Sequence, residues 1–194
     1  MKTLVNAKMY LRYLKKVVYL RFLKICKGLD FTGRIESNHK ELRGYEGCYP
    51  IITILDQLQI SSSDSILDIG CGKGLFLYYD LKYGFSKVDG IECVERLANI
   101  ATQNMKIIGD KRVHVHHIDA RSFRDYDKYN FFFINNPFSA DLMRGVADIL
   151  VGNFIRNKKR LTVIYQFPFG RRIFEERGFV IEYDNFPNVV LTIG

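Results

Sequence analysis

Short apolar runs alternate with amphipathic stretches along residues 61–194, and turn-forming residues separate them. A short apolar run between turn signals predicts a buried strand, whereas apolar residues that recur every three or four positions predict a helix. The predicted helices cover residues 74–83, 94–105, 140–154 and 171–177. The predicted strands cover residues 65–69, 88–92, 113–118, 130–134, 161–165, 179–183 and 189–193.

This alternation predicts an α/β fold with a doubly wound, mostly parallel sheet of seven strands. The last two strands are joined through Asn185-Phe186-Pro187-Asn188, which leaves no room for a crossover helix. Two strands with so short a connection pair as an antiparallel hairpin. The sheet is therefore expected to end in such a hairpin.

Residues 1–27 follow a different pattern. Wound as a helix, this segment places one uncharged stripe along its length, made up of Leu4, Ala7, Leu11, Leu14, Val18, Phe22 and Ile25. We therefore predict an amphipathic helical extension over residues 1–27 and a domain over residues 28–194, with Gly28 and Gly33 bracketing a hinge.

The charge is concentrated in the same segment. The chain has 29 basic and 21 acidic residues, a net charge of +8, yet residues 1–27 hold eight bases and no acid. The remaining residues are neutral overall, which disfavours a uniformly basic nucleic-acid-binding fold. Three interpretations of the extension stay open: docking on its own domain or on a second copy in a homo-oligomer, contact with an anionic membrane surface, or contact with nucleic acid or another acidic partner.

Neither an 18-residue apolar span nor a secretory signal pattern is visible, so a membrane-spanning or exported chain is not expected. Four scattered cysteines without a C-x-x-C pair favour a reducing compartment and argue against a zinc ribbon. His114 and His116 share one strand face and His117 points to the other, with no acidic or cysteine cluster to complete a metal site. We expect a cytoplasmic protein without a metal, peripheral to the membrane if the extension binds lipid.

The loop Asp68-Ile69-Gly70-Cys71-Gly72-Lys73-Gly74 follows the first predicted strand, where open α/β sheets bind ligands. A phosphate-binding P-loop is excluded, because Leu67 stands where its first glycine belongs and Gly74 replaces its hydroxyl residue. The dinucleotide fingerprint fits weakly, because Leu75 occupies its third glycine position. What remains is an acid followed by G-x-G-x-G.

In this loop and in the motifs that follow it, the chain resembles class I S-adenosylmethionine-dependent methyltransferases of the small bacterial type. The resemblance covers about residues 45–194 and implies S-adenosylmethionine as cofactor and S-adenosylhomocysteine as product. Glu92 is similar to the family acid that holds the ribose hydroxyls, and Asp119-Ala120 to the element that meets the adenine amino group. The cofactor-binding residues that it implies are Asp68, Gly70, Cys71, Gly72, Gly74, Glu92, Asp119, Ala120, Asn135 and Tyr49.

The methyl acceptor is expected to meet Asn135-Asn136-Pro137-Phe138, which follows the fourth predicted strand. This segment is similar to the [Asn/Asp/Ser]-Pro-Pro-[Tyr/Phe] motif of amino-methyltransferases and to the Asn-Asn-Phe motif of non-SET histone-lysine methyltransferases. The resemblance makes these four residues the expected catalytic ones and favours nitrogen, in an amine or amide, over oxygen. Asn136 stands where the first motif has proline, so oxygen and carbon acceptors stay open.

Two further segments belong to the expected site. Tyr49, with Tyr45 second, is similar to the tyrosine-proline element that covers the methionine end of the cofactor. Gln166-Phe167-Pro168-Phe169 follows the fifth strand and is expected to line the substrate side. Two other functions are weighed against methyl transfer: an NAD-binding oxidoreductase on a similar sheet, and a non-catalytic scaffold subunit that binds S-adenosylmethionine.

Overall fold

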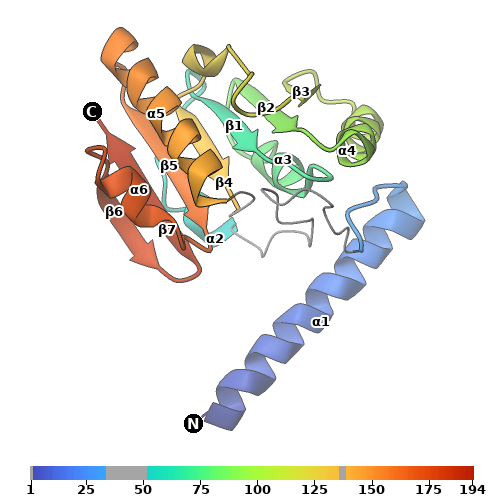
Figure 1. Ribbon diagram of the computed structural model, residues 1–194. Coiled ribbons are helices and arrows are strands. Elements are labelled where there is room, and N and C mark those ends of the chain that lie inside the picture. Colours follow the sequence, from blue (N-terminus) through green and yellow to red (C-terminus); the bar gives the residue numbers. More distant parts are fainter. Residues whose placement is uncertain (1, 34–51, 136–138) are drawn as a thin grey trace.

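The computed structural model describes residues 2–33, 52–135 and 139–194, and within them one seven-stranded sheet runs in the order β3-β2-β1-β4-β5-β7-β6 (Figure 1). Strands β1 to β5 are parallel, whereas β7 is antiparallel to both β5 and β6. This confirms the predicted fold class and its closing hairpin. The strands are β1 (Ser65–Ile69), β2 (Lys87–Glu92), β3 (Val113–His117), β4 (Phe131–Ile134), β5 (Leu161–Gln166), β6 (Val180–Asn185) and β7 (Asn188–Ile193).

Helices cover both faces of the sheet, as a doubly wound fold requires. Apolar residues of α5 and α6 pack on one face, and those of α3 and α4 on the other (Figure 1). The helices are α1 (Lys2–Lys27), α2 (Ile52–Leu55), α3 (Leu75–Asp80), α4 (Glu95–Ile108), the 3-10 turn η1 (Tyr126–Lys128), α5 (Ala140–Asn157) and α6 (Arg171–Glu175).

Side chains of the central strands alternate between two hydrophobic clusters, because successive residues of a strand point to opposite faces. In β4, Phe132 and Ile134 join the cluster under α5, whereas Phe131 and Phe133 join the cluster under α3. The ring of Phe133 stacks on that of Phe76 in α3, with a centroid distance of 3.5 Å. The consecutive phenylalanines of β4 therefore fill both sides of the sheet.

The element boundaries differ from the sequence prediction mainly at helix ends. Helix α3 stops at Asp80 instead of residue 83, because Lys82 and Tyr83 donate to carbonyl groups three residues back and tighten the last turn. Helix α4 runs further, to Ile108, where Gly109 with a φ of 73° caps it. The 3-10 turn η1 was not predicted.

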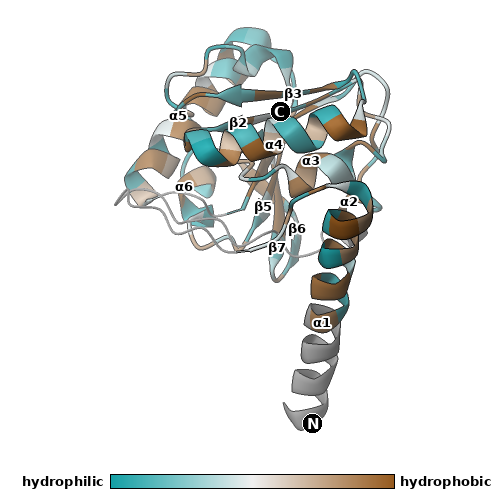
Figure 2. Cartoon of the chain, turned by 90° about the vertical axis from the view of Figure 1, so that its right-hand side faces the viewer, coloured by the Kyte–Doolittle hydropathy of each residue, from teal (hydrophilic) through white to brown (hydrophobic). Residues whose placement is uncertain are grey.

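Helix α1 docks on the domain with only one side of its last turns. Leu20 and Leu23 are buried in the cluster under α3, and the hydroxyl groups of Tyr19 and Tyr78 lie 3.2 Å apart. Before these docked turns, the coloured part of α1 projects away from the sheet (Figure 2). None of the helices described, α1 among them, has the length and hydropathy that crossing a bilayer demands.

Asp80, the last residue of α3, is fully buried, and neither of its carboxyl oxygens has a hydrogen-bond partner among the described residues. Burial, reinforced by the negative charge of Asp68, raises the pKa of the Asp80 carboxyl well above its usual range. The folded chain therefore favours the neutral form of the Asp80 carboxyl.

We expect Asp80→Asn to change how stability depends on pH. The pKa of Asp80 is higher in the folded chain than in the unfolded chain. The stability that this difference contributes is therefore fully present below the unfolded-state pKa, and it is lost as pH rises through the folded-state pKa. The stability of Asp80→Asn relative to the native chain should therefore increase from pH ~4 upward, by at most about 1.4 kcal/mol per pH unit. Urea unfolding between acidic and mildly alkaline pH measures this difference.

Asp127→Asn is the matched control, since Asp127 is exposed in η1. A pH-independent difference between Asp80→Asn and the native chain would contradict the assignment.

Candidate functional site

The glycine-rich loop between β1 and α3 bends back onto the end of β2. Gly70, Gly72 and Gly74 all adopt positive φ, with values of 82°, 57° and 79°, a region that L side chains rarely enter. The backbone N–H groups of Gly70 and Cys71 both donate to the carbonyl oxygen of Ile91, at 2.9 and 3.0 Å. The glycines therefore allow the turns, and β2 fixes them in place.

The close approach of this loop to β2 also explains a glycine inside that strand. A Cβ atom added at Gly90 would lie 2.8 Å from both Cβ and Sγ of Cys71. The buried Cys71 side chain thus fills the space above Gly90. Burial also raises the pKa of the Cys71 thiol well above its usual range, which disfavours the thiolate form that a nucleophile needs.

Glu92, the last residue of β2, connects the loop to the next segment. One carboxylate oxygen accepts the N–H of Gly72 at 2.9 Å, and the other accepts the N–H of Val94 at 2.8 Å. Burial raises the pKa of this carboxyl, while the backbone hydrogen bonds from Val94 and Gly72 act in the opposite direction. The Cys93 thiol also donates to Oε1 at 3.8 Å, a weak hydrogen bond that a ribose hydroxyl can replace, while Oε2 keeps a lone pair. Glu92 can thus accept hydrogen bonds from two vicinal hydroxyls.

Asp68 lies on the same face of the sheet as Glu92, one residue before the end of β1. Its Cα pairs with Gly90 across the parallel ladder, two residues before Glu92. Burial and the negative charge of Glu92 raise the pKa of Asp68 well above its usual range. Two buried acids on one face favour a cationic ligand, because a nearby positive charge stabilises the ionised form of both.

Asp119 follows β3 and is more exposed than the other two acids. Arg121 donates to both carboxylate oxygens, through Nε at 3.1 Å and through a terminal nitrogen at 2.8 Å. These hydrogen bonds hold the pKa of Asp119 below its usual range, so Asp119 is an ionised acceptor. The next residue, Ala120, is buried, and its carbonyl oxygen accepts the Tyr126 hydroxyl at 2.8 Å.

Asn135 follows β4 directly, next to the glycine loop. Ile134 pairs with Ile69 in the parallel ladder, so the residues that leave these two strands, Asn135 and Gly70, start side by side. The structure thus brings this predicted catalytic residue to the loop. The other predicted residues of this motif and the predicted cover of the cofactor lie outside the described residues: Asn136, Pro137, Phe138, Tyr45 and Tyr49.

Asn104 of α4 belongs to the site, although the sequence analysis did not single it out. Its side-chain nitrogen donates to the carbonyl oxygens of Lys73 at 2.9 Å and Asp30 at 3.1 Å, and its side-chain oxygen accepts the N–H of Asp30 at 2.8 Å. The Lys73 ammonium lies 3.5 Å from the Asp30 carboxylate. Asn104 thus joins the glycine loop to the segment after α1. The sequence signal that could have identified it is an asparagine at the same helical spacing as the apolar residues Leu97 and Ala101, which places a polar amide on the buried face of α4.

The strand histidines lie as predicted on two faces of β3. The rings of His114 and His116 are 4.5 Å apart, and His116 Nε2 lies 3.3 Å from the carboxylate of buried Asp89. That carboxylate also accepts the Tyr129 hydroxyl at 2.6 Å. His117 instead contacts the carbonyl oxygen of Cys93, at 3.2 Å. Within the described residues, no three His, Cys, Asp or Glu side chains form a group that could hold a metal ion.

Aromatic side chains lie beyond the end of β5, at the edge of the sheet that carries the glycine loop. Gln166 is buried and donates to the side-chain oxygen of Asn188 at 3.0 Å, which joins β5 to β7. The rings of Phe167 and Phe186 are 5.9 Å apart, while Phe169 and Phe186 are about 70% exposed, at 71% and 68%. The predicted substrate-side segment therefore presents a partly exposed aromatic surface.

These residues fit a ligand that carries a cation and a nucleoside. Asp68 and Glu92 supply buried negative charge, Glu92 retains acceptor capacity for a diol, and Asp119 offers an ionised acceptor beside them. The positive-φ glycines leave no side chain between the loop backbone and a ligand. A cation, a ribose and an amino-bearing base can thus be held by separate groups along one sheet edge.

Comparisons with known proteins agree with this arrangement. The family model described as "Histone methylation protein DOT1" matches residues 38–172. A lysine methyltransferase of Danio rerio, EEF1A lysine methyltransferase 2, is 29% identical over 97 residues, which are 50% of this chain. The matched part is 39% of that relative's length, so the chain corresponds to well under half of it.

Solved structures show the same fold at low sequence identity. A methyltransferase of Aquifex aeolicus that depends on S-adenosylmethionine is 19% identical with a TM-score of 0.55, covering 73% of this chain and 88% of its own. A ribosomal protein L11 methylase from Lactobacillus delbrueckii subsp. bulgaricus is 16% identical with a TM-score of 0.55, covering 74% of this chain and 76% of its own.

Asn104→Ala should weaken binding of S-adenosylhomocysteine. The substitution removes three hydrogen bonds that hold the glycine loop and the segment after α1 together, so the loop loses its fixed position. We expect affinity to fall by about tenfold, or ~1.4 kcal/mol, in calorimetric titration. Asn99→Ala, at an exposed position of the same helix, should bind like the native chain. Equal affinities of the two variants would refute this role of Asn104.

Binding of the same ligand should depend on pH through Asp68. Its raised pKa favours the protonated carboxyl in the free protein, and only the ionised form attracts an ammonium group. Affinity should therefore rise with pH from pH ~4 upward, and binding should release protons. Titrations in buffers with different ionisation enthalpies measure this release. Asp68→Asn should bind more weakly and lose the Asp68 share of the proton release; unchanged proton release would show that another group titrates.

Proposed function

The chain belongs to the family of the histone methylation protein DOT1 and is a class I S-adenosylmethionine-dependent methyltransferase, and from this premise we propose that it methylates an amine nitrogen, with lysine as the acceptor class. The observation that carries the proposal is the position of Asn135, a residue with a side-chain amide that follows β4 beside the glycine loop. The similarity to a lysine methyltransferase supports the same acceptor. Membership of this family leaves no support for the oxidoreductase interpretation.

The cofactor implied by the family supplies an electrophilic methyl group on a sulfonium. In this proposal, Asp68 receives the cationic amino-acid end, Glu92 the ribose hydroxyls and Asp119 the adenine amino group. Two of these acids are held in place before binding: Glu92 by the N–H groups of Gly72 and Val94, and Asp119 by Arg121. Catalysis then rests on positioning, because methyl transfer needs an in-line approach of the nucleophile.

Asn135 orients the acceptor in this proposal. A side-chain amide oxygen accepts an N–H of the target amine and so directs the nitrogen lone pair toward the methyl group. The acceptor must lose a proton for its lone pair to attack, and water at the half-buried Asn135 can take it.

The aromatic surface after β5 supports a cationic, extended acceptor. Phe167, Phe169 and Phe186 gather where β5 ends and β6 turns into β7, which the pairing of Gln166 with Asn188 places at one point of the sheet. A lysine side chain combines an apolar stem with an ammonium group, and aromatic faces attract both. This surface lies two strands from β1 in the sheet order, which corresponds to about 10 Å.

The proposal is tested by incubating the full chain with radiolabelled S-adenosylmethionine and lysine-containing peptides, alongside the same peptides with acetylated lysines. Label should enter only the peptides with free ε-amines, and mass spectrometry should place it on lysine. Asn135→Ala should lower kcat/KM by about 10²-fold and reduce affinity for S-adenosylhomocysteine far less. Phe186→Ala should raise KM for the peptide and leave affinity for S-adenosylhomocysteine unchanged.

Asn99→Ala serves again as the control and should retain activity. Label on hydroxyl oxygen or on acetylated peptides would overturn the nitrogen assignment. Equal losses of kcat and of S-adenosylhomocysteine affinity in Asn135→Ala would show that Asn135 serves the cofactor alone.

A further inference from the structure

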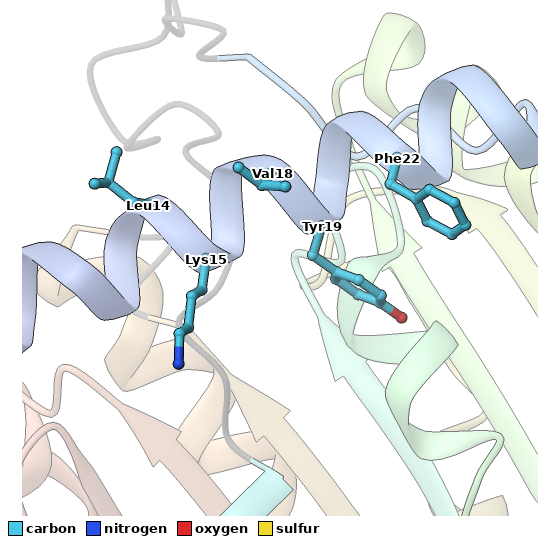
Figure 3. A pocket seen from close by; sticks show the side chains of 5 residues that line it. All are labelled: Leu14, Lys15, Val18, Tyr19 and Phe22. Carbon is cyan, nitrogen blue, oxygen red and sulfur yellow. The ribbon is translucent and has the colours of Figure 1, made fainter.

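Helix α1 carries an apolar stripe that the described residues of the domain leave uncovered. Leu14, Val18, Phe22 and Ile25 are 39%, 66%, 51% and 82% exposed, although they lie within twelve residues of chain. At 3.6 residues per turn they fall within an arc of about 80°. Figure 3 shows the first three of these side chains along one side of α1, with Lys15 and Tyr19 at its edge; together they line an open hollow on the helix.

The opposite side of α1 is the one that the domain holds. Leu20 and Leu23 are buried in the cluster under α3, so the exposed stripe faces away from the sheet. The helix end is also fixed: the N–H of Gly28 donates to the carbonyl of Lys24, and the N–H of Leu29 to that of Leu23, both at 3.1 Å. The stripe therefore has a set orientation relative to the domain.

Basic residues flank the stripe on both sides. Lys15 borders it on one side and Arg21 on the other, at about 20° from its nearest members in a helical projection, and both are exposed. The first acid of the chain is Asp30, beyond the end of α1, where it pairs with Lys24 at 3.2 Å. An exposed apolar stripe with bases on both sides and no acid on its helix matches the interfacial zone of an anionic bilayer.

We propose that α1 docks this enzyme on an anionic lipid surface, with the stripe among the acyl chains and Lys15 and Arg21 at the headgroup phosphates. A second copy of the chain fits the stripe less well. Two paired α1 helices would each bring eight basic residues and no acidic residue to the interface, so their positive charges would repel each other. A nucleic acid would neutralise the basic side chains of α1 but would leave the apolar side chains of Val18 and Ile25 exposed to water. Only the lipid surface accounts for both features.

Co-sedimentation of the full chain with vesicles tests this proposal. We expect binding to phosphatidylcholine vesicles that contain phosphatidylglycerol, little binding to pure phosphatidylcholine, and a marked loss at about 0.5 M salt. The double variant Val18→Asp/Ile25→Asp should bind at least about tenfold more weakly. Ile155→Asp is the matched control, since Ile155 is a 56% exposed isoleucine on α5, and it should bind like the native chain.

Each alternative has its own result. Absence of binding to the anionic vesicles, or equal losses in the control and the double variant, would overturn the proposal. A mass in sedimentation velocity that halves in the double variant, without vesicle binding, would assign the stripe to a second copy. Both variants should keep the native affinity for S-adenosylhomocysteine and native activity on soluble peptides, so this test and that of the acceptor fail independently.

Discussion

The site depends on one constraint: the loop after β1 must fold back onto the end of β2. The carbonyl of Ile91 accepts two N–H groups of this loop, and Glu92 accepts a third from Gly72. Left-handed glycines permit those turns, and Gly90 leaves room for the Cys71 side chain. The same carboxylate that shapes the loop is thus the one assigned to the ribose, so shaping and binding depend on one side chain.

Buried acids have two different consequences in this fold. Asp68 and Glu92 lie on one face at the sheet edge, where their raised pKa values favour a positively charged ligand. Asp80 has no hydrogen-bond partner among the described residues, and its raised pKa favours the neutral carboxyl in the folded chain. Asp119 differs from both, because Arg121 keeps it ionised near solvent. Burial and partners, and not residue type, decide which acid can act as a charged acceptor.

Helix α1 and the site are connected through a short segment. Asp30, three residues beyond α1, pairs with Lys24 of the helix and with Lys73 of the glycine loop, and Asn104 holds its backbone. Asn104 and Asp30 therefore connect the end of α1 to the glycine loop. The helix proposed for surface docking and the loop proposed for cofactor binding are thus joined by direct contacts.

The sequence alone determined the sheet, its closing hairpin and the identity of the glycine loop, because hydrophobic periodicity and glycine spacing are local properties. It also placed Asp68, Glu92, Asp119 and Asn135 at strand ends, since the carboxyl ends of parallel strands meet at one edge. Only the tertiary structure decided the role of Asn104, whose partners lie 31 and 74 residues away, and the isolation of Asp80. It also decided which side of α1 faces the domain: Leu14, Val18, Phe22 and Ile25 of the predicted apolar stripe are exposed, and Leu20 and Leu23 dock instead, because burial depends on what the rest of the chain brings alongside.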